Sequence, residues 1–351
     1  YLRGSAHQKL GNIERANSDI EASYRLGFQI NEVIANRGYT AFLLGDVEGS
    51  RRDLTSVVTN EPSNALFNAY YGDFLRSRHE YALALNYLNN ANTLDPDLGM
   101  SYVQTAKILL TLGLEELAKE ALNQSSGLDL PTVPDMIDRG QIYAFFRQYD
   151  LALSDLDEAI RINPNRAESY NARAKTYAST GAFEPALTDF NMAIQIDTTN
   201  VDYYLNQGAL YTILGEYDLA ISDLDQAILM DSSNAKSFNA RAAAYLGIGN
   251  LESALEDITR AIGIQQGGSG AEFLMAVDRD IVLGMIAAPQ PASFFATHTD
   301  STPPEEDARR ILTESALESC TKTSLLVQNA WEIRNDLSES QIELQFYENA
   351  L

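Results

Sequence analysis

The feature that most constrains the fold of this chain is a repeat of 34 residues. When Glu61-Pro62, Asp95-Pro96 and Asn163-Pro164 are aligned, the sequence divides into repeats without any insertion. The repeats are 31–64, 65–98, 99–132, 133–166, 167–200, 201–234 and 235–268, and residues 1–30 form the last part of another in the same register. A unit of this length cannot bury a core alone, so the pattern predicts an array stabilised by stacking of neighbouring repeats.

Each repeat has the pattern of two amphipathic helices. In 167–200, apolar or small residues such as Tyr170 and Ala174 precede Gly181, and Phe183 and Phe190 follow it. Their spacing is helical on both sides, and Gly181 marks the turn between the helices. The sequence therefore predicts an all-α protein.

The repeat length and these positions resemble the tetratricopeptide repeat (TPR), over residues 1 to about 266. The resemblance implies an all-α superhelical solenoid of antiparallel helix pairs. It also implies that the first helix of each pair lines a concave groove.

Pairs of Arg and Asp recur sixteen residues apart, one on each helix of a repeat. Where the Arg position holds Tyr71, the Asp position holds Tyr87, so the two positions change together and are expected to touch. We interpret the pairs as charge-assisted hydrogen bonds with a structural role, not as catalytic carboxylates. The pairs are Arg37–Asp53, Arg139–Asp155, Arg173–Asp189 and Arg241–Asp257, with Arg3–Asp19 in the partial repeat.

Charge and composition argue against several classes of function. The 351 residues carry a formal net charge of −24, which repels phosphate backbones and makes nucleic acid a poor partner. No stretch is apolar enough to predict a membrane span. The single cysteine, Cys320, excludes an internal disulfide, and the three histidines lie far apart without ligand-like companions. We therefore expect no enzymatic activity, no cofactor and no metal.

The TPR resemblance also implies which side chains face the groove. They mix amides, aromatic rings and charges, which suits hydrogen bonding to a protein segment. They are Asn36, Tyr39, Tyr70, Asp73, Arg76, Gln104, Lys107, Asp138 and Gln141, followed by Asn171, Lys175, Asp202, Asn206, Lys236 and Asn239.

A narrower interpretation is a clamp for a peptide carboxylate, as in chaperone-binding TPR proteins. Asn206 and Lys236 match two clamp positions of that family. Asn171 and Lys175 occupy two more with their residue types exchanged, and Ala240 replaces the expected Arg. These departures favour a general polar groove over the clamp.

Two segments depart from the repeat. The stretch 125–135 contains two prolines and is interpreted either as a drifted repeat or as a hinge or partner contact. Residues 267–270, Gly-Gly-Ser-Gly, have the composition of a flexible engineered linker. The segment 271–351 that follows is predicted to be helical. It is either a fragment of the binding partner joined by fusion or a natural C-terminal cap.

Together these features favour a non-enzymatic scaffold or adaptor whose groove binds an extended helical segment such as 271–351. The style of the repeats resembles bacterial TPR proteins that assemble envelope, pilus or secretion complexes. This resemblance favours the bacterial periplasm or the outer membrane over the cytoplasm. The alternative is a cytosolic co-chaperone or regulator that binds a peptide terminus, with 271–351 as its cap.

Overall fold

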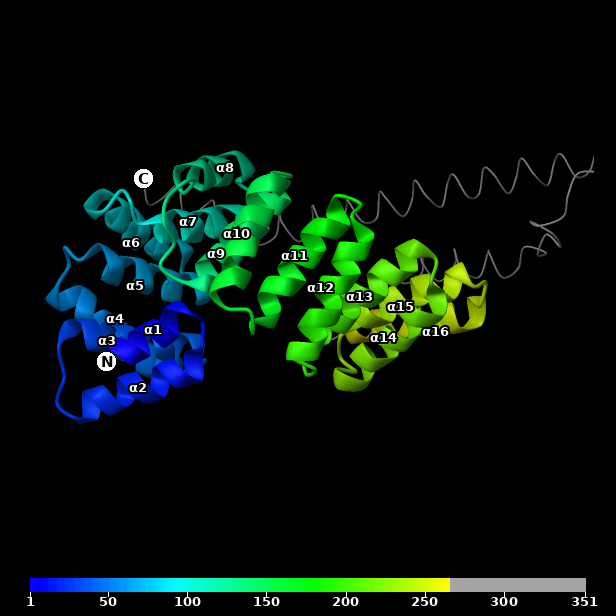
Figure 1. Cartoon of the computed structure of the whole chain (residues 1–351), viewed down its shortest axis with the longest axis horizontal. Helices are drawn as coiled ribbons and strands as arrows, with labels where there is room; N and C mark the ends of the chain where they lie inside the picture. The colour runs from blue at the N-terminus through cyan, green and yellow to red at the C-terminus, as the bar shows by residue number, and fades with distance from the viewer. Residues whose placement is uncertain (266–351) are drawn as a thin grey trace, which may run out of the picture. The chain divides into compact units, whose positions relative to one another are not determined.

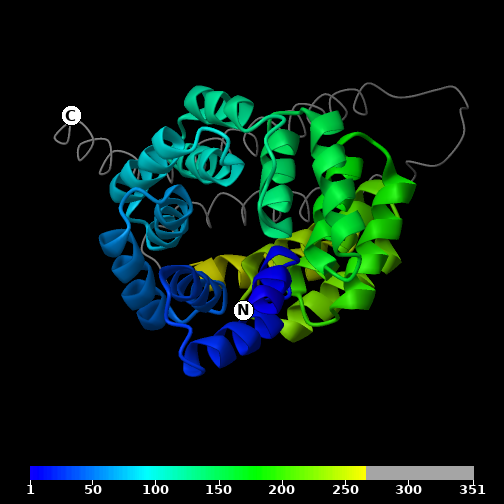
Figure 2. The same cartoon turned by 60° about the vertical axis from the view of Figure 1, so that its left-hand side comes forward.

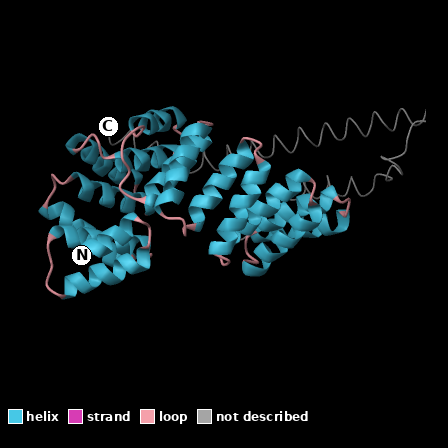
Figure 3. Ribbon diagram, in the orientation of Figure 1, coloured by secondary structure: helices cyan, strands magenta, loops and turns pink. Residues whose placement is uncertain are grey.

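A computed structural model of the protein describes residues 1–265, and within this range every regular element is an α-helix (Figure 3). The linker 267–270 and the segment 271–351 lie outside the described residues. The helices are α1 (Leu2–Lys9), α2 (Ile13–Arg25), α3 (Asn31–Leu43), α4 (Val47–Asn60), α5 (Ala65–Ser77), α6 (Tyr81–Leu94), α7 (Gly99–Thr111), α8 (Glu115–Gln124), α9 (Val133–Phe145), α10 (Tyr149–Ile162), α11 (Ala167–Ser179), α12 (Phe183–Ile196), α13 (Val201–Leu214), α14 (Tyr217–Met230), α15 (Ala235–Gly247) and α16 (Leu251–Gln265).

Consecutive helices pack as antiparallel pairs, and the pairs stack (Figure 1). Two compact units can be distinguished among the described residues, 1–198 with α1 to α12 and 199–265 with α13 to α16. In the first unit, α3, α5, α7 and α9 each contact the next first helix, whereas consecutive second helices make no comparable contact in this range. The first helices therefore form the inner layer of the curve. This arrangement confirms the predicted all-α array of helix pairs.

The turn inside each pair requires a left-handed backbone. Gly181 has φ +80° and Gly215 has φ +78° at equivalent positions, where a side chain would be strained. The same position holds His79 and Arg147 in two other repeats, with φ of 60° and 58°. The turn is therefore retained even where glycine is absent.

Small residues allow the two helices of a pair to approach closely. A Cβ placed on Gly208 of α13 would lie 2.7 Å from Leu224 Cγ and 3.1 Å from the carbonyl oxygen of Ala220 on α14. Leu224 and Ala220 are fully buried, so neither has free space into which it could move.

We therefore expect Gly208→Val to lower the free energy of unfolding by about 1–3 kcal/mol, the usual cost of overpacking. Gly263→Val on α16 is the matched control, because no atom lies within 4 Å of its Cβ position. Urea denaturation followed by circular dichroism measures both. Equal losses in the two variants would contradict the close-approach argument.

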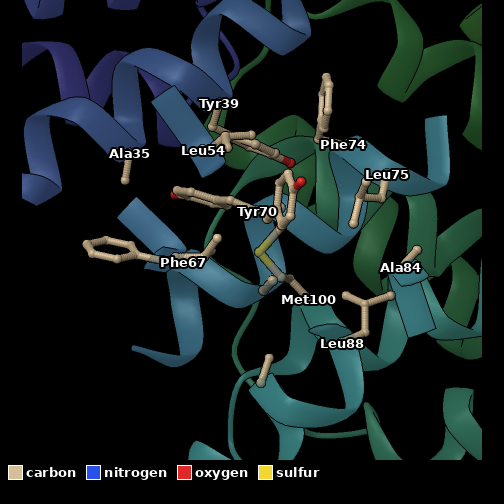
Figure 4. Packing of buried hydrophobic residues seen from close by; sticks show 14 of the residues in the cluster. Ala35, Tyr39, Leu54, Phe67, Tyr70, Phe74, Leu75, Ala84, Leu88 and Met100 are labelled. Atoms are coloured by element: carbon tan, nitrogen blue, oxygen red, sulfur yellow. The ribbon is translucent and has the colours of Figure 1, made fainter. Parts of the chain in front are cut away.

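The core of the first unit is rich in aromatic side chains between α3 and α7 (Figure 4). Tyr39 and Tyr70 stack with ring centroids 4.0 Å apart, and Phe42 meets Phe74 edge-on at 6.0 Å. Tyr71 contacts Tyr87 at 4.8 Å, so two aromatic rings meet where other repeats have an Arg–Asp pair. None of the described helices is long and apolar enough to cross a membrane.

The irregular segment 125–135 follows α8, which has only ten residues. Arg139 Nη1 donates to the carbonyl oxygens of Ser125 at 2.5 Å and Leu128 at 2.9 Å. Thr132 then caps α9 by accepting from the backbone N–H of Asp135. These contacts attach the segment to the array through its backbone.

The first unit closes on itself. The turn between α1 and α2 contacts the connection between α10 and α11, although the two are more than 150 residues apart in sequence. In Figures 1 and 2 the blue N-terminal pair accordingly lies beside the green helices that follow α9. Residues 1–166 thus form a closed ring of helix pairs.

Candidate interaction surface

The Arg–Asp pairs lie inside the helix pairs. Arg173 donates from Nε and Nη2 to the two carboxylate oxygens of Asp189, at 2.7 and 2.8 Å. The same two-pronged geometry joins Arg37 to Asp53, Arg139 to Asp155 and Arg241 to Asp257. Carboxylates held in this way are committed to structure.

The remaining guanidinium nitrogen, Nη1, makes a contact that was not predicted from the sequence. Arg173 Nη1 donates to Asp157 on α10 at 2.7 Å, and Arg241 Nη1 donates to Asp225 on α14. Each arginine therefore joins its own repeat to the one before. The signal is readable in the sequence, because an acidic residue precedes each of these arginines by sixteen positions.

Polar side chains of the predicted groove form a connected network on α3 and α5. Tyr39 donates from its hydroxyl to Asp73 Oδ2 at 3.0 Å, and Arg76 donates to Asp73 Oδ1 from Nε and Nη2 at 3.0 and 2.8 Å. Asp73 is almost fully buried. Burial and the Asp73 carboxylate raise the pKa of Tyr39, so its hydroxyl stays protonated and available as a donor.

The network has a second half on α7 and α9. Lys107 Nζ forms an ion pair with Asp138 Oδ2 at 2.6 Å, and Gln104 Nε2 lies 3.5 Å from the same oxygen. The other amide atom, Gln104 Oε1, is buried without a hydrogen-bond partner. We call the residues Tyr39, Tyr70, Asp73, Arg76, Gln104, Lys107, Asp135 and Asp138 the inner cluster.

Asp135, which the sequence did not predict as a site residue, is a buried carboxyl of the inner cluster with a strongly raised pKa. Burial raises the pKa of its carboxyl to about 7, against a hydrogen bond from Thr132 that lowers it, and the charges of Asp138 and Asp73 raise it further. Burial raises the pKa values of Tyr39 and Tyr70, and the Asp135 charge raises them further. Side chains of α3, α5 and α9 therefore converge on one region inside the ring.

Exposure divides the predicted groove residues of the first unit. Asn36, Tyr39, Tyr70, Asp73 and Gln104 are buried, with Asn36 donating to the Tyr1 hydroxyl at 2.8 Å. Arg76, Lys107, Asp138 and Asn171 are half-buried, and Gln141 and Lys175 are exposed. Access for a partner therefore improves from α5 towards α11.

In the second unit the predicted residues are more accessible. Asp202 on α13 is exposed, as are Lys236 and Asn239 on α15, and Asn206 is half-buried. We use the name exposed row for two separate sets of exposed residues, Gln141 and Lys175 of the first unit and Asp202, Lys236 and Asn239 of the second. Among residues 1–265 no group of three or more His, Cys, Asp or Glu side chains is arranged to hold a metal ion.

Comparisons with known proteins agree with the repeat pattern. Residues 137–201 match one family model described as tetratricopeptide repeat, and residues 201–234 match a second with the same description. No curated protein matches the chain.

Two solved structures share the fold. The APC/C hetero-tetramer Cut9–Hcn1 gives a TM-score of 0.62 at 17% identity, over 76% of this chain and 52% of that chain. This chain thus spans about half the length of that relative. A tetratricopeptide repeat protein from Parabacteroides merdae ATCC 43184 gives a TM-score of 0.50 at 17% identity, over 72% of this chain and 98% of that chain.

Proposed function

We propose, from the premise that this chain is a tetratricopeptide-repeat protein, that it is a non-enzymatic scaffold that binds a helical segment of a partner protein. The observation that carries the proposal is the exposed row. In each unit it places amides and charges on first helices, α9 and α11 in the first and α13 and α15 in the second. Such side chains can form hydrogen bonds and ion pairs with a bound helix.

We propose the segment 271–351 as such a partner segment, although net charge does not attract it to the rest of the chain, which is also acidic. The segment contains 14 acidic and 5 basic residues, a net charge of −9. Lys175 and Lys236 are exposed cations in the exposed row. Acidic residues of the segment can pair with these lysines, while its apolar residues provide burial.

The experiment is to insert a protease site between Gly268 and Ser269 of the full chain, cleave, and separate the products by size exclusion in moderate salt. The proposal predicts that 271–351 dissociates and rebinds reversibly. A segment that stays attached under all non-denaturing conditions, or an array that unfolds without it, would identify 271–351 as a cap instead.

A point substitution then tests the exposed row. Lys175→Glu is expected to weaken rebinding about tenfold, through loss of an ion pair and repulsion of the acidic segment. Because Cys320 is the single cysteine and lies in the segment, a dye on it reports binding by anisotropy. Lys119→Glu, an exposed lysine on the second helix α8, is the matched control and should leave affinity unchanged.

The alternative function, capture of a peptide terminus by a co-chaperone, makes a different prediction in the same assay. A short peptide with a free carboxylate would then compete with the labelled segment, and its amidated form would not. We further propose assembly of an envelope, pilus or secretion complex in bacteria as the setting. Fractionation of the native host tests this, and a purely cytoplasmic protein would argue against it.

A further inference from the structure

The contact that closes the first unit is made by two side chains. Asn163 Nδ2 donates to the carbonyl oxygen of Leu10 at 2.6 Å, and Arg166 Nη1 donates to the carbonyl oxygen of Gly11 at 2.9 Å. Asn163 is buried, and the Arg166 side chain is 18% exposed. The acceptors are backbone groups in the turn between α1 and α2.

Asn163 departs from the repeat at this position. A carboxylate can cap the following turn but cannot donate a hydrogen bond to a carbonyl oxygen. Asn163 does both, because its Oδ1 accepts from the Asn165 backbone N–H at 3.2 Å while its Nδ2 reaches Leu10. The equivalent residues of the other repeats are Glu61, Asp95, Asp129, Asp197 and Asp231.

Arg166 departs in the same way. Four of the equivalent residues cap the next helix through their side chains, namely Asn64, Thr132, Asn200 and Asn234 for α5, α9, α13 and α15. The apolar Ile30 and Leu98 give no such cap to α3 and α7. Arg166 also gives no side-chain cap to α11, but unlike these two its polar side chain reaches Gly11.

Apolar packing beside the closure is incomplete. An open pocket of about 520 Å³ lies there, lined by Leu10, Ile162, Leu130 and Met136 among others. The apolar side chains on the two sides of the closure therefore do not fill this space. Asn163 and Arg166 provide two hydrogen bonds across the closure.

We propose that Asn163 and Arg166 form a latch that holds residues 1–166 as a closed ring and covers the inner cluster. Tyr39, Tyr70, Asp73 and Gln104 lie buried within the ring. Opening the latch lets α1 and α2 move away from α10 and α11 and gives a partner access to these residues. The device is independent of whether 271–351 is the partner.

The test replaces both residues by those of the other repeats, as Asn163→Asp with Arg166→Asn in the full chain. Labels on cysteines at the exposed Ser18 and Ser154, in a Cys320→Ser background, report the distance across the closure by electron spin resonance. We expect a longer and broader distance distribution. Amide hydrogen exchange around residues 39 and 70 should also rise, by ~10-fold.

Asp95→Asn is the matched control, since it makes the reverse change at an equivalent position away from the closure. It should leave the distance unchanged. An unaltered distance in the double variant, with helicity retained, would overturn the proposal. If the double variant loses its helicity, the same distance is measured in the isosteric single variant Asn163→Asp. An unchanged distance there would then overturn the proposal.

Discussion

Replacing Asp53 by alanine is expected to lower the free energy of unfolding by about 3 kcal/mol, because the buried guanidinium of Arg37 keeps only the longer ion pair to Glu21, at 3.8 Å. Arg37 donates to the two Asp53 oxygens at 2.6 and 2.8 Å, and the side chains are only 10% and 4% exposed. Arg37 also lies over the Tyr24 ring at 3.5 Å, so it cannot turn towards solvent without losing a second contact.

Urea denaturation of the full chain measures this loss. The control is Asp19→Ala, which removes the same type of pair where Arg3 is 79% exposed. Because water can solvate Arg3 after the substitution, the change should be small. Equal losses of free energy of unfolding in the two variants would mean that burial does not determine how much these ion pairs stabilise the fold.

The second large effect is a dependence of stability on pH through Asp135. Its pKa is about 7 in the folded chain against an ordinary value of 3.8, so the folded state binds more protons between these values. The contribution of Asp135 to stability therefore falls as pH rises from about 4 to 7, by on the order of 3–4 kcal/mol.

Asp135→Asn keeps a neutral side chain at all pH values, so this fall should be absent from the variant. The measurement is the free energy of unfolding of both proteins at pH 4 to 8, compared as a difference so that other carboxylates cancel. Asp95→Asn, at an exposed position, should follow the wild type. A constant difference between wild type and Asp135→Asn would contradict the perturbed carboxyl.

The sequence is sufficient to predict the helix pairs because their causes are local. Gly181 and Gly215 mark turns, and the apolar spacing on both sides sets the buried face of each helix. The sixteen-residue spacing of Arg and Asp likewise brings Arg173 to Asp189, since it is fixed by the geometry of one pair. These features can be predicted because the residues that determine them lie within a single repeat.

The inner cluster could be predicted only in part. The pattern assigned Tyr39, Tyr70 and Asp73 to the inner face, but not their burial, because the tightness of the curve depends on packing between repeats. Asp135 was missed because it lies in the irregular segment, where the repeat template assigns it no role. Its raised pKa comes mainly from burial and in smaller part from the charges of Asp138 on the same helix and Asp73 on α5. The burial and the approach of Asp73 depend on packing between repeats.

The closure also lay beyond sequence reasoning. The change from an acidic residue to Asn163 is visible in the alignment of repeats, but it does not indicate which carbonyl the amide would reach. Leu10 is 153 positions away, and no periodicity relates the two. A departure from the repeat pattern therefore identifies a position that differs from its equivalents, but it does not identify the contact that the position makes.

The latch has a consequence for the order of folding. Helix pairs and stacks of adjacent pairs need only short loops to close, so they form early. Joining Asn163 to Leu10 requires closing a loop of about 150 residues. The entropic cost of this closure is large in the unfolded chain and becomes small only after the repeats between the two residues have folded. The ring should thus form last, and loss of the latch should speed unfolding while leaving the folding rate unchanged.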